Sequence, residues 1–187
     1  MRSLIPSPIL ARAYGGACQE ELNYSRSDLE NVASQSRNFT HTAKLGSGSA
    51  RFQHASMSLK NWEMHSRAGI AVYAPSGAPA VDATVILAIG VAPISITAPC
   101  RVVHCWDYSR SYGFTYGTLG SHPECGEETF QVDLDSNESV TLQISGISTP
   151  RYSILRIFRS VQDCAQDVIT RKYARSMRSI CAEKMPK

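Results

Sequence analysis

Several common motifs are missing from this 187-residue sequence. Its six cysteines include no Cys-x-x-Cys pair, the spacing typical of zinc ribbons and dithiol redox sites. There is no run of about eighteen consecutive apolar residues, so the sequence offers no candidate transmembrane helix. A phosphate-binding glycine loop, a Gly-x-Ser-x-Gly turn and a His-Glu-x-x-His motif are also missing. These absences predict buried free thiols, no metal, no nucleotide cofactor and no membrane span.

Length and composition predict one soluble domain. A chain of 187 residues can hold one well-buried core and is short for two domains. Two prolines interrupt the only apolar patch near the N-terminus, which disfavours a secretory signal. Residues 1–19 contain two arginines and no acid, so organelle targeting stays open beside the expected disordered tail over residues 1–21. We expect a cytoplasmic protein with one domain over residues 22–182 and a tail over 183–187.

Alternating and β-branched segments predict an antiparallel sheet. Turn signals separate them, and every connection is too short for a crossover helix, so neighbouring strands are expected to pair antiparallel. One short segment, Phe39–Leu45, comes first, and Leu22–Tyr24 is a further candidate. The six later segments are Ile70–Tyr73, Thr84–Val91, Ile96–Asp107, Tyr112–Leu119, Glu127–Leu134 and Ser139–Ile147.

Two amphipathic stretches predict helices. Between Ser49 and His65, apolar residues recur at three- and four-residue spacings. A longer stripe runs from about Pro150 to Cys181, with Thr149 as a suitable N-cap and the proline at the first helical position. Only a sheet would offer this long helix a large enough apolar partner. The sequence therefore predicts an α+β fold in which a curved antiparallel sheet of six to seven strands grips a long C-terminal helix.

Positive charge is concentrated at the C-terminus. From residue 149 onward there are nine basic and three acidic side chains, a net charge of +6, whereas the whole chain carries +3. Basic residues late in a helix complement its dipole and solvate its outer face, which disfavours nucleic acid as a partner. A basic interaction module that binds nucleic acid or anionic lipid through this helix remains an alternative.

Strand alternation places one acid on the apolar face of the expected sheet. Counting in steps of two from Phe130 and Leu134 puts Glu128 on their face and Glu127 on the opposite one. Burial of an isolated ionised carboxylate is costly. Glu128 is therefore expected either to be held by an ion pair or hydrogen bonds, or to face a ligand or a reacting group.

Side chains on other elements are candidates for the same site. Tyr116 has the inward register, while Arg101 and His104 are expected on opposite faces of an earlier strand, so only one of those two can join it. Two loop residues, His122 and Glu124, either contact a polar ligand group or only build a turn. Two residues on one face of the first helix belong either to the core or to the pocket wall. These two are Trp62 and His65.

Three segments resemble one known family. They are Asn61–Ile70, Pro99–Val103 and Gly113–Phe130, the last containing the blocks Tyr-Gly-Thr-Leu and Gly-Glu-Glu-x-Phe. Over about Leu22–Ile180 the chain resembles the family called domain of unknown function 1990, which belongs to the START-like, birch-allergen-like helix-grip superfamily. The resemblance implies a curved sheet wrapped about a long C-terminal helix, with an apolar molecule bound between them.

The expected function combines this resemblance with the inward acid. We expect a small, largely apolar or amphipathic ligand between sheet and helix, with its polar end oriented by Glu128, Tyr116 and Arg101. The first alternative is an enzyme of the same fold that uses Glu128 or His122 as general acid or base. The second is the basic interaction module described above.

Overall fold

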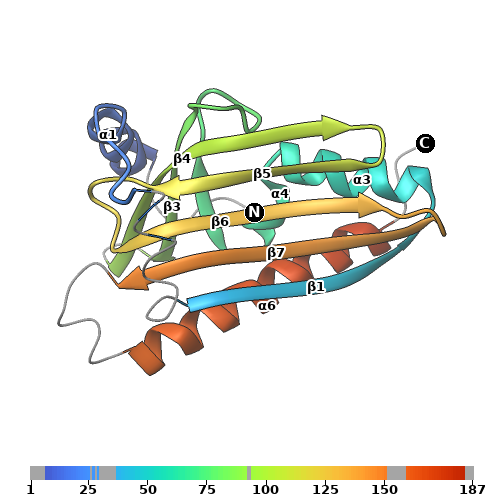
Figure 1. The fold of residues 1–187 in the computed structure, drawn as a ribbon. Coiled ribbons are helices and arrows are strands. Elements are labelled where there is room, and N and C mark those ends of the chain that lie inside the picture. The colour runs from blue at the N-terminus through green and yellow to red at the C-terminus, as the bar shows by residue number, and fades with distance from the viewer. Residues whose placement is uncertain are drawn as a thin grey trace.

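One curved antiparallel sheet dominates the structure, a computed structural model (Figure 1). Its seven strands follow the order β1-β7-β6-β5-β4-β3-β2, and the sheet curves around helix α6 (Arg159–Ala182). The strands are β1 Arg37–Ser47, β2 Ile70–Tyr73, β3 Thr84–Val91, β4 Ile94–Tyr108, β5 Ser111–Thr118, β6 Glu124–Leu134 and β7 Ser139–Pro150. The fold class expected from the sequence is confirmed.

Parts of the chain lie outside this description. The structure describes residues 7–25, 27, 29, 37–91, 94–150 and 159–183. Within these ranges only the backbone is described for residues 7, 37, 91, 94, 149, 150 and 159–166. None of the described helices combines the length and the apolar character needed to cross a membrane.

Turn chemistry fixes the register of the strands that carry the site. After β6, the Asp135 carboxylate accepts the backbone N–H groups of Asn137 and Ser139, each at 2.8 Å. Such side-chain acceptance stabilises a tight turn. From this turn the β6–β7 pairing continues without a bulge and places Glu128 opposite Gly146. The alternation counted from the sequence therefore holds along the whole of β6.

The main hydrophobic core lies on the concave face of the sheet. Helices α3 (Ser49–Lys60) and α4 (Glu63–Arg67) and the C-terminal half of α6 pack there, as Figure 1 shows. Phe114, Phe130, Leu142 and Ile144 of the sheet are fully buried against them. Each such side chain contributes ~1.5–3 kcal/mol through burial.

The first expected helix, from Ser49 to His65, is two helices. Trp62 has a left-handed backbone, with φ of 57°, and interrupts the helical path between α3 and α4. Its indole N–H donates to the carbonyl oxygen of Gly77 at 2.9 Å, and its ring packs on Phe114. These tertiary contacts outweigh the local cost of a left-handed conformation. The apolar periodicity continues across the break because both helices bury residues in the same core on the concave face of the sheet.

Helix α1 (Ser7–Ala17) covers the opposite, convex face of the sheet. Leu10 and Ala17 are buried there against Ile86, Ala88 and Leu119. A disordered tail was expected over residues 1–21. The structure instead has this helix over Ser7–Ala17, and residues 1–6 lie outside the described chain. The helix was missed because its glycines and nearby prolines weaken the helical pattern.

The C-terminal helix begins later than expected. Thr149 and Pro150, expected as N-cap and first helical residue, extend β7 and pair with Cys125 and Glu124 of β6. The N-cap prediction is therefore wrong, because strand pairing takes these residues first. Residues 151–158 lie outside the described chain, and α6 is described from Arg159. Figure 1 shows that it starts at the side of the sheet where β6 begins and β7 ends.

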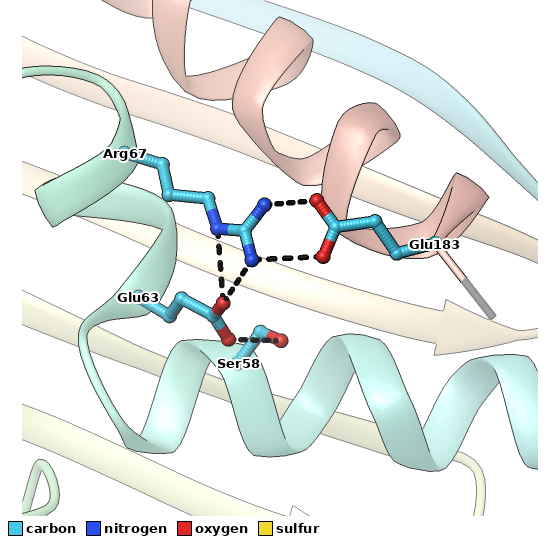
Figure 2. Close-up of polar contacts among 4 residues, drawn as sticks. All are labelled: Ser58, Glu63, Arg67 and Glu183. Carbon is cyan, nitrogen blue, oxygen red and sulfur yellow. Dashed lines mark hydrogen bonds and ion pairs between the residues drawn. The ribbon is translucent and has the colours of Figure 1, made fainter. Parts of the chain in front are cut away.

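A polar cluster fixes the other end of α6. Arg67 at the end of α4 forms a bidentate ion pair with Glu183, just beyond α6, and also contacts Glu63 (Figure 2). Ser58 donates to the remaining Glu63 oxygen at 3.1 Å, which ties α3 into the same cluster. Bidentate guanidinium–carboxylate pairs are geometrically specific. The cluster sets where the helix ends against the small helices.

Candidate functional site

Glu128 on β6 and Tyr116 on β5 form a hydrogen-bonded pair on the concave face. The two residues are direct cross-strand neighbours, and the tyrosine hydroxyl donates to carboxylate Oε2 of Glu128 at 2.7 Å. Tyr116 is 5% exposed, whereas Glu128 is only partly buried. The sequence-predicted pair is thus in contact.

Burial gives this carboxyl an unusual acidity. Burial, with a smaller contribution from the charge of Glu124, raises the pKa of Glu128 to about 7 against the opposing effect of the Tyr116 hydrogen bond. Among the described residues no lysine, arginine or histidine lies within ion-pair distance of it. Of the two structural alternatives, an ion pair or hydrogen bonds, the described part of the chain shows the hydrogen bond from Tyr116 and no ion pair. The carboxyl changes its protonation state near neutral pH.

Two further groups surround the pair. Tyr173 reaches it from α6, and the charge of Glu128 adds to burial in raising the pKa of this tyrosine well above its usual value. Burial likewise raises the pKa of the Cys100 thiol on β4, with Glu128 second among the causes. Tyr173 was not among the residues predicted from the sequence. Its spacing of four residues from both Ile169 and Met177 was the available signal.

His65 lies in a cage of aromatic rings beside this cluster. It is 0% exposed, and neither ring nitrogen has a hydrogen-bond partner among the described residues. Its ring centroid is 4.8 Å from those of Phe130 and Tyr173 and 5.1 Å from that of Trp62. Burial lowers its pKa to about 3, so the imidazole is neutral at physiological pH. Both His65 and Trp62 are therefore packed within the core.

Arg101 and His104 do not reach Glu128. A β-bulge between Val102 and His104 adds one residue to β4, so both side chains lie on the convex face rather than on opposite faces. The Arg101 guanidinium donates to the carbonyl oxygen of Cys18 at 3.3 Å, next to α1. His104 is exposed and packs against Trp106. The expectation that one of them could join the inward acid is wrong.

The loop between β5 and β6 is held by its own residues. Nδ1 of the buried His122 contacts the backbone N–H of Glu124 at 2.9 Å, and burial lowers the pKa of the ring to about 4. Asn23 donates to the Glu124 carbonyl oxygen at 2.9 Å and accepts the Thr118 hydroxyl. His122 thus builds the turn, while Glu124 acts on the site through its charge.

Two glycines of the motif leave space that a side chain would fill. A Cβ on Gly117 would lie 2.0 Å from the Tyr24 hydroxyl, which donates to Glu127 on the convex face at 2.8 Å. A Cβ on Gly126 would lie 1.9 Å from the carbonyl oxygen of Ile147. Steric contacts therefore explain why glycine occupies these two positions in the Tyr-Gly-Thr-Leu and Gly-Glu-Glu blocks. They let chain segments approach the strands that present Glu128.

The convex face carries a shallow groove that the sequence did not predict. It has a volume of about 390 Å³ over β1, β6 and β7. Its lining residues are Asn38, Phe39, Thr40, Glu127, Thr129, Ser145, Gly146 and Ile147. Glu127 and Glu128 thus face different environments, one a surface groove and the other the concave interior.

Comparisons with solved structures show the same architecture. A hypothetical protein from Helicobacter pylori aligns with a TM-score of 0.58 and 6% identity, over 85% of this chain and 95% of that one. The Zhui aromatase/cyclase from a Streptomyces species gives 0.55 and 14% over 78% and 93%. Major latex-like protein 151 from Panax ginseng gives 0.51 and 15% over 79% and 99%. At these identities the likeness shows the helix-grip fold alone.

Sequence comparison shows a closer relationship. A UPF0548 protein from Deinococcus radiodurans is 25% identical over 154 residues, which are 75% of this chain and 76% of that protein. Residues 22–176 match the family described as "Domain of unknown function (DUF1990)", and this stretch contains β1 to β7, both small helices and most of α6. The chain therefore belongs to the DUF1990 family.

Proposed function

We propose that this protein binds a small, largely apolar molecule on the concave face of the sheet, between the sheet and α6. The observation that carries the proposal is the Glu128 carboxyl. It points inward, is hydrogen-bonded by Tyr116, and has no cationic partner among the described residues. A binding pocket of this kind combines apolar walls with a few converging polar groups.

The surroundings of Glu128 supply those apolar walls. Phe130, Tyr173 and His65 pack edge to face or tilted against one another beside the acid. Rigid aromatic side chains give large contact areas at small entropic cost. Helix-grip proteins often bind apolar molecules between sheet and helix, which supports the same location for a ligand.

Keeping such an acid in the core is costly for the fold. A carboxyl with its pKa raised to about 7 destabilises the folded state whenever it is ionised. A purely structural residue at this position would be more stable as an apolar side chain of similar size. The cost is explained if the carboxyl is needed for recognition, since strained or destabilised groups concentrate at functional sites.

Ligand screening tests the proposal. Native mass spectrometry and thermal shift with isoprenoids, phenolics and single-chain lipids should find molecules that bind the wild-type protein and bind the Glu128→Gln variant at least about tenfold more weakly or with altered selectivity. Glu127→Gln is the matched control, because it removes the neighbouring charge on the convex face. The proposal fails if nothing in the panel binds, or if the control and the test variant behave alike.

A second candidate, an enzyme of the same fold, is favoured by one observation. A general acid or base works best with a pKa near the working pH, and the pKa of Glu128 is about 7. His122 does not suit this role, since its Nδ1 is held in the turn and its pKa is lowered. Turnover of a bound ligand that is lost in Glu128→Gln, with a pH–rate profile centred near the same pKa, would favour the enzyme.

A further inference from the structure

We propose that this site selects ligands by their polar end: it accepts molecules that end in a hydrogen-bond donor, such as alcohols, phenols and amines, and rejects carboxylic acids. The inference rests on the proposed function and adds the chemical class of the ligand. It follows from the hydrogen bonds and charges around Glu128.

The hydrogen-bonding capacity left at the Glu128 carboxylate is that of an acceptor. Tyr116 uses its hydroxyl hydrogen to donate to Oε2 of Glu128. The other carboxylate oxygen, Oε1, has no partner among the described residues. An ionised carboxylate offers about four acceptor positions and no donor. A ligand whose polar end contacts Oε1 must therefore donate a hydrogen bond to it.

The charges around the acid lead to the same class of ligand. Four titratable groups face it from the strands and from α6: Tyr116, Tyr173, Cys100 and Glu124. None of these groups carries positive charge in either protonation state. The residue opposite Glu128 on β7 is Gly146, which has no side chain. The imidazole of His65, among the neighbouring aromatic rings, is neutral.

An acid-ended ligand would meet a second negative charge in this space. Two carboxylates that share a poorly solvated site repel each other, so one of them must take up a proton before the ligand binds. An alcohol avoids that cost and donates to Oε1. An ammonium group gains from the negative charge as well. The expected order of affinity is amine or alcohol first and acid last.

Three probes with the same hydrocarbon chain test this order. Decylamine, 1-decanol and decanoate are titrated below their micelle concentrations by native mass spectrometry and isothermal calorimetry, at a pH well above 7 where Glu128 is ionised. The alcohol and the amine are expected to bind at least about tenfold more tightly than the acid. Because the chain is constant, the difference reports the polar end alone.

The variants then assign the selectivity to one side chain. Glu128→Gln should reduce amine binding and raise decanoate binding, each about tenfold, since the amide is neutral and both donates and accepts. Glu127→Gln should leave the order unchanged. If decanoate binds wild-type protein as tightly as decanol, the inference is wrong while the proposed function stands. If none of the three probes binds, the inference is wrong, and the proposed function is then decided by the wider ligand screen described above.

Discussion

Replacing Glu128 by glutamine is expected to stabilise the protein at high pH and to have no effect in acid. The folded-state pKa of this carboxyl is about 7, against an ordinary value of 4.5. Because the folded pKa is raised, the protonated acid favours the folded state. Its contribution is fully present below pH 4.5 and is lost as the pH rises through 7.

The size of the effect follows from the shift. A difference of 2.5 between the pKa values 4.5 and 7 corresponds to about 3 kcal/mol, at ~1.36 kcal/mol for each unit. Glutamine is neutral at every pH and keeps an oxygen that accepts the Tyr116 hydroxyl. We therefore expect Glu128→Gln to be about 3 kcal/mol more stable than wild type at pH 8 and equal to it at pH 4. In a domain of this size that gain raises the Tm by ~6–12 °C.

Urea denaturation followed by circular dichroism at several pH values measures this difference directly. Glu127→Gln is the control, because it removes a carboxylate from the same strand without removing a concave-face charge, and it should show no gain at pH 8. The reasoning is refuted if Glu128→Gln is no more stable than wild type at pH 8. That result would mean that a cation or several donors hold the ionised carboxylate in the folded protein.

Three further predictions concern the walls and supports of the site. The pKa of His65 is lowered to about 3 from 6.5, so its neutral form favours folding above pH 6.5. As the pH falls below 6.5, the free energy of unfolding decreases by ~1.36 kcal/mol for each pH unit. His65→Phe should remove most of this pH dependence in urea titrations, and the exposed control His104→Phe should not. Arg67→Ala removes the ion pair with Glu183 and should speed amide hydrogen exchange in the last turns of α6 only, whereas faster exchange throughout the sheet would contradict a local role. Gly126→Ala forces a Cβ against a backbone oxygen and should cost ~1–3 kcal/mol or more in thermal unfolding, while Gly15→Ala in α1, with open space around it, should be neutral or stabilising.

Strand parity made the central residue predictable. β6 pairs with both neighbours without a bulge, so counting in twos from Phe130 placed Glu128 and Glu127 on the correct faces. The same counting failed on β4, because one extra residue near Val103 moves everything after it to the other face. No residue type in that segment announces the bulge. The bulge puts His104 on the convex face together with Arg101, which precedes it and was expected beside the acid but lies against α1.

Contacts between distant residues determine the helix and strand boundaries that the local sequence pattern does not predict. Trp62 breaks a helix whose periodicity continues across the break, because its indole has a partner far along the chain at Gly77. Thr149 and Pro150 carry a good helix-start pattern, yet pairing with β6 keeps them in a strand. The prediction for a ligand cavity beneath α6 concerns a region where the side chains of residues 159–166 are outside the description. It stays a prediction.

Titration of the Glu128 carboxyl by carbon-13 NMR tests the account most directly. The carboxyl resonance is assigned by comparison with Glu128→Gln and followed from acid to alkaline pH. A midpoint near 7 is predicted, and bound decanol should move it downward because a donated hydrogen bond favours the ionised form. A midpoint near 4.5 that no ligand displaces would show a solvated surface acid and contradict the account.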